Sequence, residues 1–185
     1  MDSIPVHALW LAQDDPKKNT AVLASKRGDL TLHKNVRSLP KRGVILEPLC
    51  GKVFGPEDHE LLTQRRGALV GLDCSWAHIE TSVESVMKRT RLQPRMLPLL
   101  LAANPVNWGK PGRLTTAEAL ATVLYLVGRR DQAADVLGAF RWGGRFFELN
   151  HEPLDAYASA TSSQQLVDLQ FDFFDIERPP EGDES

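Results

Sequence analysis

The feature that most constrains the fold is a continuous apolar run, Ala68-Leu69-Val70-Gly71-Leu72, which ends on Asp73. An unbroken apolar run of strand length is typical of a strand buried on both faces of a parallel sheet. Arg65-Arg66-Gly67 before it is a helix stop, and the segment from Trp76 to Arg89 after it carries apolar residues at helical spacing. The pattern therefore predicts an α/β protein with this run as a central strand.

The rest of the first half alternates in the same way between short β-rich runs and helix signals. A further apolar run, Met96 to Ala103, follows Pro94 and is also predicted to be a buried strand. The other predicted elements are strands at Ile4 to Leu11, Leu30 to His33 and Val44 to Leu46, a short helix from Thr20 to Lys26, and a helix that begins at Pro56.

The second half is predicted to be mainly helical. Thr115-Thr116-Ala117-Glu118 is a capping box, and the apolar stretch from Ala119 to Val127 behind it predicts a helix buried on most sides. Further helices are expected at Gln132 to Phe140, from Arg145 into Tyr157, and at Ser163 to Phe171.

These patterns divide the chain into an α/β domain over residues 1–103, a helical domain over 104–176 and a disordered acidic tail over 177–185. The junction, Asn104 to Gly112, is rich in Asn, Gly and Pro and is expected to be a shaped loop. Ligands of α/β proteins collect at the carboxyl ends of strands, so Asp73 and this loop are expected to face one cleft.

Composition excludes several classes of protein. No apolar run reaches the roughly 18 residues of a membrane span, and the start of the chain does not resemble a signal peptide, so we expect a cytoplasmic protein. Cys50 and Cys74 are expected to be buried free thiols, and neither they nor the five histidines have metal-like spacing, so no metal is expected.

Charge is unevenly distributed. Of 24 acidic and 22 basic residues, six acids and one base lie from Phe171 onward, which leaves 21 bases against 18 acids on the body. Paired bases recur, for example Lys17-Lys18 and Arg129-Arg130. Such pairs are compatible with RNA binding, although paired bases are more often simply solvated.

Several ordered motifs carry a resemblance to a known family. They are Leu72-Asp73-Cys74-Ser75-Trp76, the stretch from Arg95 to Gly109, Leu114 to Leu120, Phe140 to Gly143 and Phe147 to Asn150. In these motifs the chain resembles the small-subunit rRNA aminocarboxypropyltransferases of archaea and eukaryotes, over nearly its whole length. It departs from that pattern at Asn19, where Cys is common, and at Trp108, where Tyr is common.

The resemblance implies a SPOUT-like fold in which a deep trefoil knot of the backbone holds S-adenosylmethionine. It implies transfer of the 3-amino-3-carboxypropyl group to N3 of a uridine or (methyl)pseudouridine in small-subunit rRNA or the pre-ribosomal small subunit, with release of methylthioadenosine. It also implies a monomer. The nucleotide itself, and any need for prior methylation, are not apparent from the sequence.

Two residues are expected to act nearest the chemistry. By resemblance, Trp76 forms an apolar wall around the cofactor methyl group, and its ring could favour the sulfonium by about 0.5 to 2 kcal/mol; the alternative is an aromatic core anchor. Asp73 is a candidate for positioning the acceptor or taking the N3 proton. An N-cap of the helix after it is an equally plausible role for Asp73.

The resemblance also implies a set of cofactor contacts. The carboxylate would be bound by Thr20 and by the N–H of Thr116, and the ribose by the carbonyl of Leu72. From sequence alone, helix capping is the simpler role for the threonines, and plain core packing is the simpler role for the apolar residues. Those expected around adenine are Leu46, Pro48, Leu97, Gly112, Leu114 and Ala119.

Two other functions remain open at this point. A knotted RNA methyltransferase would share the fold but expose the methyl group and form S-adenosylhomocysteine. A non-catalytic assembly factor would bind rRNA through its basic body and would not bind S-adenosylmethionine.

Overall fold

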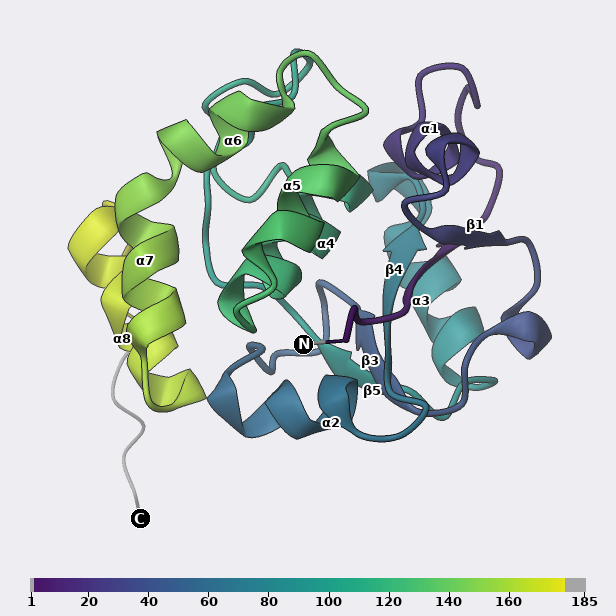
Figure 1. Cartoon of the computed structure of the whole chain (residues 1–185), viewed down its shortest axis with the longest axis horizontal. Helices are drawn as coiled ribbons and strands as arrows, with labels where there is room; N and C mark the ends of the chain where they lie inside the picture. Colours follow the sequence, from purple (N-terminus) through teal and green to yellow (C-terminus); the bar gives the residue numbers. More distant parts are fainter. Residues whose placement is uncertain (1, 179–185) are drawn as a thin grey trace.

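A computed structural model describes residues 2–178, and it contains one sheet of five strands in which every neighbouring pair is parallel (Figure 1). The strand order is β2-β1-β4-β3-β5, so the apolar run that ends on Asp73 is the central strand, as the sequence predicts. The strands are β1 (Val6–Trp10), β2 (Thr31–His33), β3 (Gly43–Leu46), β4 (Ala68–Asp73) and β5 (Gln93–Arg95).

Helices cover both faces of the sheet. In Figure 1, α3 lies on one side of the sheet, α4 and α5 lie on the other, and α6 to α8 run along the edge of the molecule away from α3. The helices are α1 (Thr20–Arg27), α2 (His59–Thr63), α3 (Ile79–Met87), α4 (Thr116–Leu126), α5 (Arg130–Leu137), α6 (Gly143–Leu149), α7 (His151–Ser159) and α8 (Ser163–Phe173). Single 3-10 turns, Pro56–Asp58 and Trp76–His78, lead into α2 and α3.

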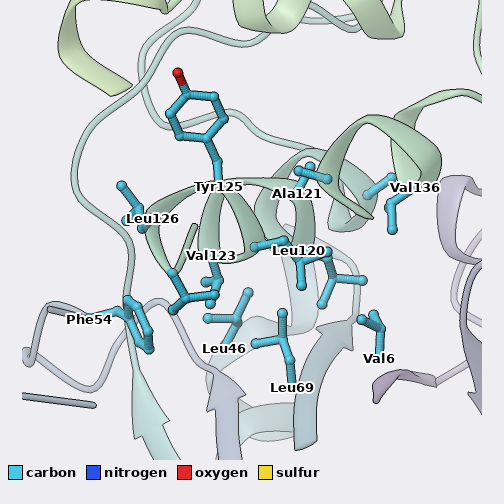
Figure 2. Close-up of a cluster of buried hydrophobic side chains, with 14 of the residues drawn as sticks. Val6, Leu46, Phe54, Leu69, Leu120, Ala121, Val123, Tyr125, Leu126 and Val136 are labelled. Atoms are coloured by element: carbon cyan, nitrogen blue, oxygen red, sulfur yellow. The ribbon is translucent and has the colours of Figure 1, made fainter. Parts of the chain in front are cut away.

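The two faces of the sheet have separate cores. Strand residues alternate between them, because successive side chains of a strand point to opposite faces. Val6, Leu46 and Leu69 pack with α4, α5 and α1, as Figure 2 shows for α4. Leu9, Ile45 and Val70 pack on the other face with Val86 and Met87 of α3.

Helix α4 is the centre of the larger core. Its capping box is confirmed: the Thr115 hydroxyl accepts from the Glu118 N–H at 3.3 Å, and the Glu118 carboxylate accepts from the Thr115 N–H at 2.7 Å. The helix lies close to β4 because Gly71 has no side chain. A Cβ at Gly71 would stand 2.8 Å from Thr116 Cγ2 and 3.3 Å from Leu120 Cδ2.

The prediction of a strand over Met96 to Ala103 is wrong. The strand in this part of the chain is β5, which ends just before the run. The run itself forms only isolated bridges. Pro98 cannot donate a ladder hydrogen bond, and the run bonds to side chains of the helical half instead. The N–H groups of Leu99, Leu101 and Ala103 donate to Gln170 Oε1, Asn150 Oδ1 and Glu118 Oε1, at 2.7, 2.8 and 2.7 Å.

The single helix predicted from Arg145 into Tyr157 is also wrong, since α6 ends and α7 begins at Asn150. Asn150 is fully buried, and its amide donates to the carbonyls of Leu101 and Phe146, both at 2.9 Å. The free thiols of Cys50 and Cys74 are partly exposed rather than buried. Of the tail predicted as disordered, residues 179–185 lie outside the described residues. Among residues 2–178, no helix is long and apolar enough to cross a membrane.

Candidate active site

A cavity of about 470 Å³ opens at the carboxyl edge of the sheet. After β1 the chain turns into α1 on one face of the sheet, and after the neighbouring β4 it turns into α3 on the other face. The connections therefore leave the two adjacent strands in opposite directions. Such a switch point is where open parallel sheets bind ligands, and the volume suits a small molecule. Every residue predicted for the site lines this cavity: Thr20, Leu46, Pro48, Leu72, Asp73, Trp76, Leu97, Gly112, Leu114, Thr116 and Ala119.

The Asp73 carboxylate is held by donors from two helix starts. Thr116 Oγ1 donates to Oδ1 at 3.1 Å, and the side-chain amide of Asn19 donates to Oδ2. The same amide donates to Asp14 Oδ2 at 2.8 Å, and the Asn19 carbonyl oxygen caps α1 by accepting from the Val22 N–H at 2.9 Å. Asn19 therefore joins a helix cap to the carboxylate.

The alternative role of Asp73 as an N-cap is wrong. Ser75 caps the turn at Trp76, since its hydroxyl accepts from the Ala77 N–H at 3.2 Å. Burial raises the pKa of Asp73 above its ordinary value, and the charge of Asp14 acts in the same direction, whereas the hydrogen bonds from Asn19 and Thr116 oppose both. The carboxylate is thus fixed in place and made more basic.

Two helix N-termini meet at the cavity. Thr20 is the first residue of α1, and its hydroxyl accepts from the Ala117 N–H in the first turn of α4 at 3.2 Å. Within residues 2–178, neither the Thr20 N–H nor the Thr116 N–H has a hydrogen-bond acceptor. Free N–H groups at two helix starts favour an anionic group between them. Thr115 caps α4, as the simpler interpretation predicts.

Trp76 is half-exposed, at 49%, and lines the cavity, so it is not a core anchor. The guanidinium of Arg113 lies over its ring, 5.3 Å from the centroid. Arg113 also lines the cavity, and sequence reasoning did not single it out. One part of the wall is apolar: Leu97, Leu114 and Ala119 are half-buried and pack against the larger core.

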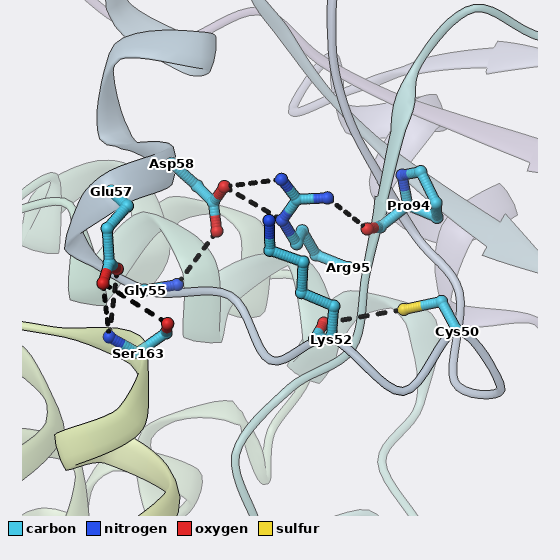
Figure 3. Close-up of polar contacts among 8 residues, drawn as sticks. All are labelled: Cys50, Lys52, Gly55, Glu57, Asp58, Pro94, Arg95 and Ser163. Atoms are coloured by element: carbon cyan, nitrogen blue, oxygen red, sulfur yellow. Dashed lines mark hydrogen bonds and ion pairs between the residues drawn. The ribbon is translucent and has the colours of Figure 1, made fainter.

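Arg95, one of the lining residues of the cavity, forms a buried ion pair with Asp58 (Figure 3). Arg95, at the end of β5, donates from Nη2 and Nε to Asp58 Oδ1 at 2.8 and 2.9 Å, and the other oxygen of Asp58 accepts from the Gly55 N–H at 3.2 Å. Both charged side chains are nearly inaccessible, so removing one partner would leave an uncompensated buried charge. The pair ties the cavity wall to the start of α2.

Sequence reasoning missed the supporting residues Asn19, Arg95 and Arg113. Asn19 did carry a signal, because an Asn directly before a predicted helix is a common N-cap. Arg95 carried none, since a charged residue after a strand is ordinarily solvated. The burial of Arg95 becomes apparent only from its ion pair with Asp58, which is distant in sequence.

The fold and the cavity define a class, the α/β proteins that bind a small ligand at the carboxyl ends of parallel strands. Residues 44–174 match the family described as ribosome biogenesis protein, C-terminal. The chain is 40% identical to the 16S rRNA aminocarboxypropyltransferase of Methanothermobacter thermautotrophicus and 41% identical to that of Methanopyrus kandleri, each over 86% of this chain and 92% of the relative.

A solved structure agrees with these relatives. The chain superposes on the SAM-dependent rRNA:acp-transferase Tsr3 from Vulcanisaeta distributa with a TM-score of 0.76 and 34% identity, covering 91% of this chain and 96% of that one. The chain belongs to the 16S rRNA aminocarboxypropyltransferase family.

Proposed function

We propose that this protein transfers the 3-amino-3-carboxypropyl group of S-adenosylmethionine to N3 of a uridine or pseudouridine in small-subunit rRNA. One observation carries the proposal: two free helix N-termini, a fixed carboxylate and an apolar wall meet in a single cavity of ligand size. Membership of the family supports the choice of donor and acceptor.

Each chemical group of S-adenosylmethionine has a suitable partner in the cavity. The free N–H groups of Thr20 and Thr116 suit its carboxylate. The half-buried side chains of Leu97, Leu114 and Ala119 suit adenine, and Trp76 suits the methyl side of the sulfonium. When bound, S-adenosylmethionine supplies a carbon–sulfur bond activated by positive charge.

The chain itself supplies orientation and a basic group. Trp76 would cover the methyl side of the donor, so the nucleophile could not align with the methyl carbon. Asp73, held by Asn19 and Thr116, is positioned to hold the acceptor base or to take its N3 proton as the new bond forms. Its raised pKa favours the second role.

Product analysis tests the proposal. Purified protein incubated with small-subunit rRNA and S-adenosylmethionine is expected to release methylthioadenosine and to add the aminocarboxypropyl mass to one nucleotide, read by mass spectrometry. S-adenosylhomocysteine as the product would mean a methyltransferase instead. No binding of S-adenosylmethionine by calorimetry would point to a non-catalytic assembly factor.

Trp76→Ala tests the role of Trp76 as the wall beside the cofactor methyl group. We expect S-adenosylmethionine binding to weaken by about tenfold, from lost cation–π and apolar contact, and transfer to slow with it. Trp142→Ala is the matched control, because Trp142 stacks on Phe140 and does not line the cavity. Equal affinity in wild type and Trp76→Ala would refute this role.

We further propose that the backbone is threaded in the deep trefoil knot of the SPOUT-like class, and that residues 1–103 and 104–176 are the two domains joined by it. The protein is proposed to work as a cytoplasmic monomer on the pre-ribosomal small subunit. A knotted chain stretched between its ends by optical tweezers would fall short of its full contour length. Light scattering after size exclusion would give the mass of one chain or of a dimer.

A further inference from the structure

Most of the large apolar side chains that are strongly exposed line the cavity or adjoin its lining residues in the chain. Among residues 2–178, the strongly exposed ones are Leu49 at 51%, Trp76 at 49%, Val106 at 83%, Trp108 at 51% and Ile176 at 40%. Leu49 follows the lining residue Pro48, Trp76 lines the cavity itself, and Val106 and Trp108 flank the lining residue Asn107. We call these four the rim residues: Leu49, Trp76, Val106 and Trp108. Exposed apolar side chains grouped in one place mark a surface that binds something.

The loop that carries two of the rim residues is built rigidly. Asn104 is buried and donates from Nδ2 to Glu118 Oε2 at 2.9 Å and to the Arg113 carbonyl at 3.2 Å. Glu118, fully buried, also accepts from the N–H groups of Ala103 and Asn104 at 2.7 and 3.1 Å. The start of the loop is thus anchored on Glu118 in the first turn of α4, and its end at Arg113 is tied back to Asn104.

Hydrogen bonds within the loop fix its tip as well. The Asn107 N–H donates to Asn104 Oδ1 at 3.0 Å, the Lys110 N–H donates to the Asn107 carbonyl at 2.9 Å, and the Gly109 N–H donates to the Ala102 carbonyl at 2.7 Å. Trp108 therefore stands in solvent on a fixed turn, beside a cavity. A rigid, exposed aromatic ring loses little conformational entropy when a partner stacks on it.

The charged side chains around the rim residues indicate which kind of partner binds there. Arg113 lies over the Trp76 ring, Lys18 lines the cavity and Lys110 is exposed beside Trp108. The acids that line the cavity are already engaged: Asp14 by the Asn19 amide and Trp10 Nε1, Glu47 by the Leu49 N–H, and Asp73 by Asn19 and Thr116. Aromatic rings interleaved with cations are the pattern that binds single-stranded nucleic acid, through stacked bases and neutralised phosphates.

We propose that the rim is a stacking platform for single-stranded RNA, on which Trp108 stacks against a base next to the acceptor nucleotide and Arg113 neutralises a phosphate. The proposal rests on the proposed function, since it assigns the surface that brings the acceptor to that site. The platform holds the flanking nucleotide, while the acceptor base leaves the stack and enters the cavity.

The test uses a synthetic RNA hairpin whose loop contains the mapped acceptor uridine with 2-aminopurine on either side. Trp108→Ala is expected to raise the KM for this RNA and weaken its binding by about tenfold or more, and to abolish the quenching of one 2-aminopurine. Trp108→Phe is expected to restore most of the affinity, and the affinity for S-adenosylmethionine stays at the wild-type value. Arg113→Gln is expected to reduce the salt dependence of RNA binding by about one charge.

Ile176→Ser is the matched control, since it removes an exposed apolar side chain that does not line the cavity, and it should change none of these values. RNA binding is measured separately from transfer, so a wild-type protein that binds the hairpin but forms no product would count against the proposed function and not against the platform. Unchanged RNA affinity and quenching in Trp108→Ala would overturn the platform. So would a defect seen with pre-ribosomal particles and absent with the hairpin, which would identify a protein-binding surface.

Discussion

The Asp73 carboxylate receives hydrogen bonds from the starts of two helices that are far apart in sequence. Thr116 belongs to the helix start that faces the proposed cofactor carboxylate, and Asn19 belongs to the cap of α1. Position and basicity of the carboxylate are therefore set together. A change in either donor should alter both.

Asn19→Ser tests this coupling at a single residue. A serine hydroxyl can still cap α1, so stability should fall by less than about 1 kcal/mol, but it cannot donate to two carboxylates at once. Loss of a donor to the ionised form raises the pKa of Asp73 further. Activity that needs ionised Asp73 would then be lost at a higher pH as the pH falls, so the acid limb of the kcat profile should move upward.

Asp73→Asn provides the comparison for that profile. Removing a base should lower kcat by about a hundredfold or more and remove the acid limb, with less effect on the affinity for S-adenosylmethionine. An acid limb that stays in place in Asn19→Ser would show that Asn19 does not act through Asp73. A fully active Asp73→Asn would show that orientation of the acceptor suffices.

At the scale of elements, the contact between β4 and α4 positions the site. Gly71→Ala would place a Cβ 2.8 Å from Thr116 Cγ2, so the Thr116 side chain must shift, which would disturb its hydrogen bond to Asp73. We expect a loss of about 1 to 3 kcal/mol in the free energy of unfolding and weaker binding of S-adenosylmethionine, measured by denaturant unfolding and calorimetry. Gly144→Ala, in open space on α6, should be neutral or stabilising and leave the affinity unchanged. Wild-type affinity in Gly71→Ala would contradict the close approach.

Elements that depend on local signals could be predicted from the sequence. The structure confirms the central strand that the apolar run predicts and the helix α4 that the capping box predicts. Both patterns are complete within a few residues. The run from Met96 to Ala103 has an equally apolar pattern but no strand, because its backbone bonds to side chains of later helices. The break at Asn150 has the same cause. Tertiary partners of this kind leave no periodic trace in a sequence.

At the scale of the whole molecule, the helical half holds one wall of the cavity. Leu99 lines the cavity, its N–H donates to Gln170 of α8 at 2.7 Å, and its carbonyl accepts from the Tyr157 hydroxyl of α7 at 2.9 Å. The wall is therefore positioned by helices that are distant in sequence and do not themselves line the cavity.

Gln170→Ala tests this long-range support. We expect S-adenosylmethionine binding to weaken several-fold, because the Leu99 backbone loses its acceptor, and the free energy of unfolding to fall by about 1 to 2 kcal/mol. Gln164→Ala is the matched control, since Gln164 lies on the same helix and its side-chain amide donates to the neighbouring Asp168 Oδ1, at 3.2 Å. Calorimetry and thermal unfolding measure both effects. If Gln170→Ala bound the cofactor as tightly as Gln164→Ala, the wall would not depend on α8.

The reliance of Leu99 on Gln170 also sets a time order for synthesis of the protein. The partner of the wall lies 71 residues later in the chain, so a nascent chain that has emerged only through α4 has the capped helix and the sheet but an unsupported wall. The fully supported cavity can then form only after α8 has left the ribosome. A polypeptide stalled before α8 would hold the cofactor less tightly, so an incomplete product of translation would be a poorer enzyme.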